Sequence, residues 1–224
     1  MIAIAEIISI GDELLYGQTL DTNAHWISHK LDEYNIKVFQ RTTIGDDADQ
    51  ILSAFATAAK RVDIVLITGG LGPTKDDLTK HLLAKYFGVG MVHHQEVLRD
   101  ITLLFAKASR EVTALNAQQA ELPANCEKIT NPVGTAPGMW FYENNTVFVA
   151  MPGVPYEMKS IMTQGILPKL HEMFSKGVLH HHIIKTIGIT ESSLSDLIED
   201  WEVNLPKHIK LAYLPTKGQV KLRM

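Results

Sequence analysis

Residues 63–79 read DIVLITGGLGPTKDDLT, an apolar run that leads through glycines into two adjacent aspartates. The run from Asp63 to Thr68 has the length and β-branched content of a strand buried on both faces. Glycine allows the backbone after it to adopt positive φ and to approach a ligand closely. A helical pattern of apolar residues then extends from Asp76 to Phe87. The segment therefore predicts a strand, a glycine turn and a helix, the repeating unit of a parallel sheet.

Two similar units precede this segment. Residues 4–10 and 36–44 predict strands, and helical patterns follow them from Asn23 and over residues 47–61. The resulting β-α-β-α-β-α alternation implies right-handed crossovers and helices on both faces of the sheet. We therefore predict a three-layer α/β/α domain with a mostly parallel sheet over residues 1–174.

The remainder of this domain is less regular. Helical patterns cover residues 96–109 and 114–121, and residues 139–151 alternate around an Asn-Asn turn, as in a β-hairpin. Pro155 suits the first turn of a helix, which we expect to continue to about Phe174.

After residue 177 the pattern changes. A strand over 181–187, a helix over 191–201 and strands over 210–214 and 219–224 give the order β-α-β-β. A compact split-βαβ arrangement has one more helix and one more strand. We therefore expect a partial small α+β domain over residues 178–224, cut from a longer protein.

The composition indicates the cellular location of the protein and the classes of partner that it does not bind. Of the 224 residues, 46% are hydrophobic and 21% are charged, which is ordinary for a globular protein. No apolar run approaches the length of a membrane span, no signal peptide is recognisable, and the single cysteine, Cys126, has no internal partner for a disulfide. These features predict a cytoplasmic protein that does not bind membranes. The net charge of -4 and the lack of a basic cluster argue against direct contact with nucleic acid.

The predicted strand ends suggest where a ligand binds. In open parallel sheets, ligands bind beyond the carboxyl ends of the strands. Those ends are Gly11-Asp12-Glu13, Gly45-Asp46-Asp47 and the segment from Gly69 to Asp77. All three are acidic or rich in glycine, and this predicts a binding site there.

The glycine segment suits a phosphate group. A helix N-terminus offers unpaired N–H groups and a positive partial charge to an anion. The spacing fits neither the dinucleotide-binding fingerprint nor a Walker loop. A plain glycine turn, with Asp76 or Asp77 capping the next helix, fits the same letters, so both interpretations stay open. The candidate phosphate- and nucleotide-binding residues are Gly11, Asn23, Gly69, Gly70, Gly72, Thr74, Lys75 and Gly153.

The aspartates suggest a cation. Two adjacent acids that face a phosphate need a metal ion to cancel the repulsion, and oxygen ligands favour Mg²⁺, Mn²⁺ or another hard ion. We take Asp12, Asp76 and Asp77 as candidate metal ligands, and Asp46 and Asp77 as candidate catalytic residues. Cys126 has no base that could be argued from the sequence, so we do not expect it to act as a nucleophile.

These motifs resemble the CinA family (competence/damage-inducible protein A). The matching segments run in the family's order over residues 1 to about 170, and residues 187–194 and 211–223 resemble its small middle domain. The matching letters are GDELLYG at 11–17, DTN at 21–23, GDD at 45–47, TGGLGPTKDDLT at 68–79, PG at 137–138 and MPGVP at 151–155.

The resemblance implies a molybdopterin-binding-like fold and metal-dependent hydrolysis of ADP-ribose to AMP and ribose 5-phosphate. It also implies a divalent cofactor (Mg²⁺, Mn²⁺ or Co²⁺), allows a monovalent cation such as K⁺, and suggests a homodimer. In related molybdopterin-binding proteins the aspartates that correspond to Asp77 and Asp46 are functional. The family's further amidase domain is absent from this sequence, so that activity is not expected.

One departure from the related enzymes bears on the function. Leu71 stands where the molybdopterin enzymes usually have threonine, and Asp76 stands where they have a basic residue. The acidic residue in place of a basic one favours a site that binds a metal-bound diphosphate over a site that transfers an adenylyl group to molybdopterin. The alternative is a non-catalytic nucleotide- or molybdopterin-binding module of a larger CinA-like protein.

Overall fold

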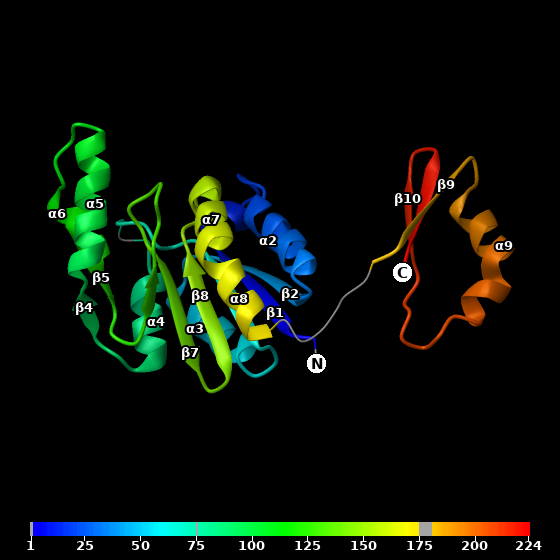
Figure 1. Cartoon of the computed structure of the whole chain (residues 1–224), viewed down its shortest axis with the longest axis horizontal. Coiled ribbons are helices and arrows are strands. Elements are labelled where there is room, and N and C mark those ends of the chain that lie inside the picture. Colours follow the sequence, from blue (N-terminus) through cyan, green and yellow to red (C-terminus); the bar gives the residue numbers. More distant parts are fainter. Residues whose placement is uncertain (1, 75, 175–180) are drawn as a thin grey trace. The chain divides into compact units, whose positions relative to one another are not determined.

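The computed structural model describes residues 2–74, 76–174 and 181–224, and the chain divides into two compact units, Met1–Val178 and Leu179–Met224. The larger unit is built on a six-stranded sheet in the order β2-β1-β3-β8-β7-β6 (Figure 1). These strands are β2 Lys37–Ile44, β1 Ile4–Ile10, β3 Ile64–Thr68, β8 Thr146–Met151, β7 Gly138–Glu143 and β6 Glu127–Ile129.

The strand order creates a crevice at the carboxyl edge of the sheet. Strands β2, β1, β3 and β8 are parallel, whereas β7 and β6 run antiparallel to their neighbours, so the sheet is mostly parallel as predicted. From β1 the chain crosses to β2 on one side, and from β2 it crosses back to β3 on the other side of β1. The loops after β1 and β3 therefore diverge at a topological switch point, where open α/β sheets bind ligands.

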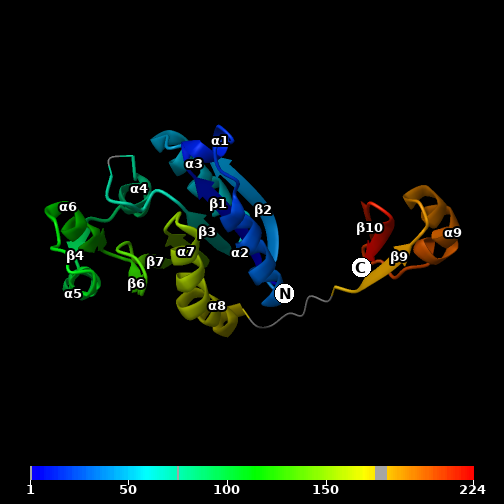
Figure 2. The same cartoon turned by 90° about the horizontal axis from the view of Figure 1, so that it is seen from above.

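Helices cover both faces of this sheet, which gives the predicted three layers (Figures 1 and 2). One face packs against α2 and the long helical segment that begins at Pro155, and the other packs against α3, α4 and α5. The bounds are α2 Thr22–Glu33, α3 Ala48–Ala58, α4 Thr79–Phe87, α5 Gln95–Lys107, α7 Pro155–Ile161 and α8 Leu167–Phe174. A π-helical stretch, Met162–Ile166, joins α7 to α8.

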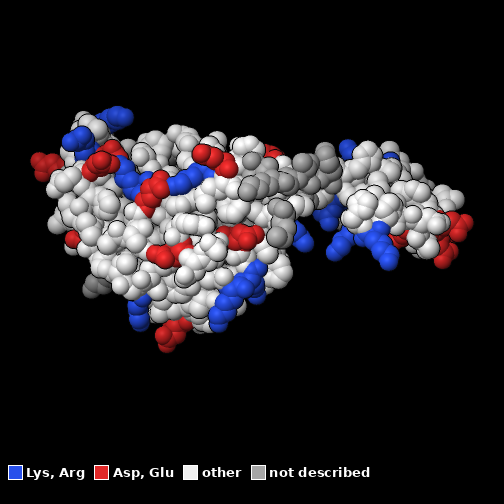
Figure 3. Space-filling view, turned by 60° about the horizontal axis from the view of Figure 1, so that its bottom comes forward, with Lys and Arg blue, Asp and Glu red and all other residues white. Residues whose placement is uncertain are grey.

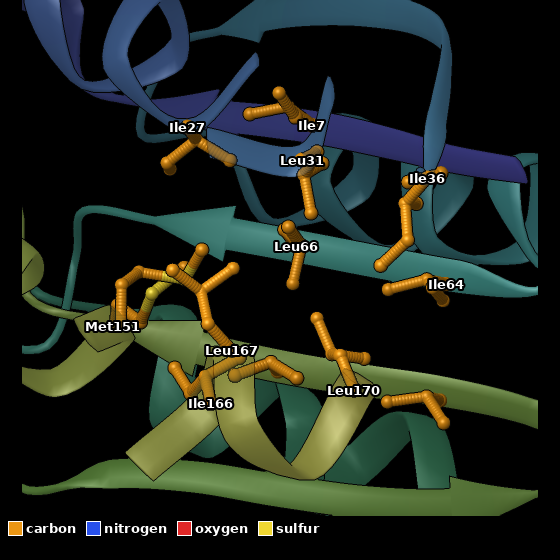
Figure 4. Packing of buried hydrophobic residues seen from close by; sticks show 14 of the residues in the cluster. Ile7, Ile27, Leu31, Ile36, Ile64, Leu66, Met151, Ile166, Leu167 and Leu170 are labelled. Carbon is orange, nitrogen blue, oxygen red and sulfur yellow. The ribbon is translucent and has the colours of Figure 1, made fainter. Parts of the chain in front are cut away.

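Alternating strand residues supply two apolar cores. On the α2 face, Ile7 and Leu66 from neighbouring strands meet Leu31 of α2 and Leu170 of α8, and all four are fully buried (Figure 4). Burial of each such side chain stabilises the fold by about 1.5–3 kcal/mol. These cores fix the strand ends, and the ends carry the candidate site.

Some predicted boundaries are wrong. The third helix begins at Thr79 and not at Asp76, and its N-cap residue, Leu78, makes no side-chain cap. The helix predicted over 114–121 is a short helix, α6 Ala114–Ala117, followed by a 3₁₀ turn, Gln118–Ala120. The sequence pattern also missed several short elements: α1 Asp12–Leu15, β6, and the two-stranded sheet of β4 Met91–His93 and β5 Glu121–Pro123.

The smaller unit is a three-stranded antiparallel sheet with one helix. Its strand order is β10-β11-β9, and α9 packs against one face through Leu194, Val220 and Leu222. The bounds are β9 Ile183–Ile187, α9 Glu191–Val203, β10 Ala212–Thr216 and β11 Gln219–Arg223, in the predicted β-α-β-β order. In neither unit does the described part of the chain contain a helix long and apolar enough to cross a membrane.

Candidate functional site

Gly69 joins the ends of β1 and β3 at the switch point. Its φ is 108°, and a Cβ atom there would lie only 2.1 Å from the carbonyl oxygen of Ile10. Its N–H donates to the carbonyl oxygen of Met151 at 3.1 Å, which ties the loop to β8. Gly153, in the turn after β8, lies so close that its Cβ would sit 3.4 Å from the Gly69 Cα. Three strand ends therefore meet at backbone level, and glycine makes that approach possible.

Asn23 locks these loops together from α2. Its Nδ2 donates to Thr68 Oγ1 at 3.0 Å and to the carbonyl oxygen of Gly153 at 2.7 Å. Thr68 Oγ1 in turn donates to the carbonyl oxygen of Pro152 at 3.1 Å. Asn23 Oδ1 and Ser9 Oγ, by contrast, are buried without a hydrogen-bond partner among the described residues. Asn23 is therefore a positioning residue of the strand ends, and its expected direct contact with a nucleotide stays a prediction.

The glycine loop folds back onto the first turn of α4. Gly70 has φ 65°, and a Cβ there would lie 2.3 Å from Thr79 Oγ1. Thr79 Oγ1 donates to the Gly69 carbonyl at 3.0 Å, and the Thr79 N–H donates to the Gly70 carbonyl at 3.1 Å. One N–H at the start of α4 is thereby used within the loop and is not available to an anion. No pattern in the sequence indicated this role of Thr79.

Asp12 and Asp46 face each other across the ends of β1 and β2. The Asp12 N–H donates to Asp46 Oδ2 at 3.1 Å, and the Asp46 N–H donates to Asp12 Oδ1 at 3.3 Å. A Cβ at Gly45 would lie 2.3 Å from Asp12 Oδ1, so a larger residue there would displace that carboxylate. Gly11, with φ 155° and an N–H that donates to the Ile44 carbonyl at 3.0 Å, sets the start of the first loop. The two acidic loops expected at neighbouring strand ends are therefore joined directly through Asp12 and Asp46.

Acidic groups that follow two other strands, β1 and β3, act on Asp46. Partial burial raises its pKa, and repulsion from the carboxylates of Asp12, Glu13 and Asp76 raises it further. The hydrogen bond from the Asp12 N–H opposes this rise. Asp76 thus lies within electrostatic reach of the first two loops. A carboxylate with a raised pKa is a better proton acceptor at neutral pH than an ordinary one.

Asp77 has a different environment. Its Oδ2 accepts hydrogen bonds from the Thr74 N–H at 2.9 Å and from the Thr74 hydroxyl, so the carboxylate closes its own loop. A Cβ at Gly72 would lie 2.4 Å from this oxygen. A hydrogen bond from Thr74 also lowers the pKa of the exposed Asp76 carboxyl. Lys75, a candidate phosphate ligand, lies outside the described residues.

The acidic side chains of the loops bear on the predicted binding of a divalent cation. Over residues 2–74, 76–174 and 181–224, no three His, Cys, Asp or Glu side chains are gathered closely enough to form a complete metal cage. Mg²⁺, however, commonly takes one or two carboxylates and completes its shell with water and substrate phosphates. A single carboxylate, such as that of Asp12, would suffice for a site of this kind. A role of Asp77 as a ligand would require its carboxylate to leave Thr74.

Lys80, which the sequence offered beside Lys75 as a possible partner of phosphate, is a buried cation. It follows Thr79 on α4, is 8% exposed and donates from Nζ to the Gln118 carbonyl at 3.0 Å. Burial lowers its pKa, and the carboxylates of Glu121 and Asp77 oppose that effect. Lys80 therefore links the glycine loop electrostatically to the segment before β5. Because lysines in a helical pattern are usually exposed, the sequence did not indicate that Lys80 is buried.

A second loop is fastened beside the start of α7. Asn131 donates from Nδ2 to the Ala136 carbonyl at 2.9 Å and to Glu157 Oε2 at 2.7 Å. Burial raises the pKa of Glu157, and the hydrogen bond from Asn131 opposes that rise. A Cβ at Gly134 would lie 1.9 Å from Glu157 Oε2. The turn-rich letters of 131–138 indicated a loop, but they did not reveal this fastening.

A groove lies elsewhere on the larger unit. It has a volume of about 520 Å³ and runs between β2 and α3, with Glu6, Thr42 and Arg61 in its lining. Glu6 is 1% exposed and accepts hydrogen bonds from Arg61 Nε at 2.8 Å, Arg61 Nη2 at 2.7 Å and Thr42 Oγ1 at 2.7 Å. Because these groups satisfy one another, the groove offers a ligand no free charge of this set. The switch point remains the better candidate for chemistry.

Comparison with known proteins shows which class of protein this chain belongs to. Residues 6–172 match the family model described as probable molybdopterin binding domain, and residues 181–224 match the model described as damage-inducible protein CinA KH domain. The chain therefore has a molybdopterin-binding-type domain followed by a CinA-type middle domain. With these two parts in this order, the chain belongs to the CinA family, and the resemblance seen in the motifs is confirmed.

Relatives agree over nearly the whole chain. A CinA-like protein of Cytophaga hutchinsonii is 48% identical over 220 residues, and one of Flavobacterium psychrophilum is 46% identical over 221 residues. Each alignment covers 98% of this chain but 53% of the relative. The chain thus spans about half the length of the curated relatives it matches.

Solved structures support the fold. The protein CinA of Thermoplasma acidophilum, described as having unknown function, superimposes with a TM-score of 0.67 at 32% identity, and the match covers 77% of this chain and 98% of that one. A molybdopterin biosynthesis protein of Mycobacterium abscessus gives a TM-score of 0.53 at 17% identity, covering 79% of this chain and 96% of that one. The second likeness concerns the fold alone.

Proposed function

We propose that the larger unit hydrolyses the diphosphate of ADP-ribose, or of a related nucleotide, to AMP and ribose 5-phosphate with the help of a divalent cation. The observation on which this rests is the reciprocal pairing of Asp12 with Asp46 at the ends of β1 and β2, beside the glycine loop of a topological switch point. Acids gathered next to a potential phosphate site make sense when a cation and a water molecule join them.

In this proposal the backbone of residues 69–72 contacts the diphosphate. The tight turn at Gly69 and Gly70 leaves no side chain between the backbone and a ligand, so phosphate oxygens can approach the loop. Asn23 fixes the turn after β8 against β3 and keeps this surface in place. The ligand is thereby held with its diphosphate toward the acidic ends of β1 and β2.

Asp46 is the proposed general base. Its raised pKa brings its proton affinity closer to neutral pH, which makes it a more effective acceptor of a proton from the attacking water. Asp12 positions Asp46 through two reciprocal hydrogen bonds, in each of which the backbone N–H of one residue donates to the carboxylate of the other. When bound, the cation would supply charge neutralisation at the phosphate oxygens, and Asp12 with Asp76 would hold it, while Asp46 acts as the base.

The test compares matched aspartate variants in AMP release from ADP-ribose. We expect Asp46→Asn to lower kcat by about 10²–10⁴-fold, the usual contribution of a general base. Asp196→Asn, an exposed change on α9 of the smaller unit, removes the same charge and should leave turnover unchanged. Full turnover in Asp46→Asn would contradict the assignment of the base.

A non-catalytic binding module is the second candidate. The observation in its favour is that Asp77 is held by Thr74 and that no complete metal cage is formed among the described residues. In this case the acidic loops would only select a cation-bound nucleotide. Calorimetric binding of ADP-ribose with Mg²⁺, together with no AMP release by the same folded sample, would establish the module and reject hydrolysis.

A further inference from the structure

Two histidines are neighbours on the outer side of α2. His25 and His29 are both exposed, whereas the buried side of this helix packs against the sheet (Figure 1). Side chains four residues apart on a helix have Cβ atoms about 5–6 Å from each other. Two imidazoles at this spacing can bind one metal ion from a single helix face. The helix therefore carries a pair of potential metal ligands away from the acidic strand ends.

A carboxylate one turn further along determines which nitrogen of His29 is free. His29 Nδ1 lies 3.0 Å from Glu33 Oε1. A carboxylate only accepts hydrogen bonds, so Nδ1 carries the proton in this contact, and the neutral ring keeps its lone pair on Nε2. Histidines that bind metal ions almost always donate their other ring N–H to such a partner, which orients the ring. His29 is thus held in the form that binds a metal ion through Nε2.

Lys30 keeps Glu33 in place. Lys30 Nζ lies 2.7 Å from Glu33 Oε2, so each carboxylate oxygen has its own partner. The hydrogen bond from Lys30 is the main cause of a lowered pKa of the Glu33 carboxyl. This pairing also offsets the positive charge of Lys30, which would otherwise repel a cation at the histidines. His25 forms no ion pair or side-chain hydrogen bond with any other residue that the structure describes, so its ring is available to an ion.

The two imidazoles indicate the class of ion. Imidazole nitrogen suits Zn²⁺, Cu²⁺ and Ni²⁺, whereas Mg²⁺ and Ca²⁺ prefer oxygen ligands. Over residues 2–74, 76–174 and 181–224, no three His, Cys, Asp or Glu side chains could together hold a metal ion, so water would complete the coordination shell. Structural zinc sites are instead closed by four protein ligands. A site with two imidazoles is therefore suited to an ion that exchanges with solution.

The surface charge gives no comparable indication of a ligand. On the face of the larger unit seen in Figure 3, acidic and basic side chains are interspersed. Attraction by net charge therefore does not favour a polyanion or a polycation on that face. The imidazole pair is the more specific feature, because its geometry and its donor atoms both select a transition ion.

We propose that His25 and His29 bind one exchangeable transition ion of the Zn²⁺ class, with Glu33 as the positioning residue for His29. The ion would link adjacent turns of α2, the helix from which Asn23 holds the end of β3 against the loop after β8. Because the folded helix brings the two histidines together and the unfolded chain does not, the ion favours the folded state. The proposal does not depend on the hydrolysis proposed for the larger unit.

Calorimetric titration of Zn²⁺ into the untagged chain at about pH 7.5, where an ordinary histidine is mostly neutral, tests the site. Excess Mg²⁺ occupies carboxylates without competing for imidazole. We expect the tightest binding event to be lost in His25→Asn and in His29→Asn. Glu33→Ala should keep this event and weaken it by about 10–100-fold, the usual effect of removing the partner of a metal-binding histidine. Unchanged affinity in Glu33→Ala would refute the positioning role.

Urea unfolding gives a second measurement of the same site. With free Zn²⁺ at about 100 times its Kd, the equilibrium constant for unfolding of the wild type should fall by up to about 100-fold. The stability of His25→Asn/His29→Asn should not respond to Zn²⁺. Equal stabilisation of this variant and the wild type would overturn the proposal, because the ion would then act elsewhere.

A matched control removes two histidines from another part of the chain. His181→Asn/His182→Asn shortens the run of three histidines at 180–182 and should keep the tightest Zn²⁺ binding. Equal weakening in the two double variants would overturn the proposal, because histidine content and not helix geometry would then explain the binding. If the wild type releases AMP from ADP-ribose with Mg²⁺, His25→Asn/His29→Asn should do so at the same rate. A lost rate would contradict the separation of this site from the catalytic carboxylates.

Discussion

Replacement of Asn23 tests whether the three strand ends are held as described. Asn23→Ala removes two hydrogen bonds, to Thr68 Oγ1 at 3.0 Å and to the Gly153 carbonyl at 2.7 Å. The residue is 8% exposed, so water does not readily replace these bonds. At about 1–1.5 kcal/mol for each bond, we expect the free energy of unfolding to fall by about 2–3 kcal/mol.

The isosteric variant Asn23→Asp makes this prediction more specific. A carboxylate only accepts hydrogen bonds, and the Thr68 hydroxyl already donates to the Pro152 carbonyl. The variant would therefore place an unpaired negative charge against the Gly153 carbonyl, and such uncompensated buried charges cost about 3–5 kcal/mol. Asn23→Asp should thus be less stable than Asn23→Ala, although it preserves the shape of the side chain.

Urea unfolding at pH 7 measures both effects. The midpoint should move to lower urea in the order wild type, Asn23→Ala, Asn23→Asp, with an unchanged slope of free energy against urea. A loss below about 0.5 kcal/mol in Asn23→Ala, or an aspartate variant as stable as the wild type, would refute the proposed bridging role.

Three further predictions concern other parts of the larger unit. Arg61→Ala leaves the buried Glu6 carboxylate without its cation and should lower the free energy of unfolding by about 3 kcal/mol in urea titrations, while Glu6→Gln/Arg61→Met should recover much of that loss. Gly69→Ala would place a Cβ 2.1 Å from the Ile10 carbonyl oxygen, so we expect lost ligand binding by calorimetry and a lower thermal midpoint; a variant equal to wild type in both would contradict the close approach. Burial raises the pKa of the Cys126 thiol to about 12, so the folded protein at pH 8 should react with iodoacetamide about a thousandfold more slowly than an exposed cysteine, and rapid labelling would show that the thiol is accessible.

The sheet could be predicted because its strands have strong local signals. The continuous apolar runs of β1 and β3 end at glycines, and the helices between them have regular apolar faces, so order and direction followed from right-handed crossovers. Short strands such as β4 and β5, of three residues each, have no period that a sequence reveals. They form because α4 and α5 bring them together, and that is a tertiary effect.

The candidate site could be predicted only to the level of loops. Their positions after predicted strands placed Asp12 and Asp46 at the same edge of the sheet, since the carboxyl ends of parallel strands lie together. The direction of the Asp77 side chain depends on a hydrogen bond within its own loop, to Thr74. Burial of Lys80 depends on the carbonyl of Gln118, which lies 38 residues further along the chain. Such contacts have no signature in the local sequence.

The most direct test of the central claim is AMP release from ADP-ribose by the purified chain, with Mg²⁺, Mn²⁺ and Co²⁺ each compared against a chelator. We expect turnover that requires a divalent cation and is lost in Asp46→Asn and, if Asp77 turns from Thr74 toward the ligand during turnover, in Asp77→Asn as well. Absence of turnover with every cation, in a folded sample that still binds ADP-ribose, would contradict the account and leave the larger unit as a binding module.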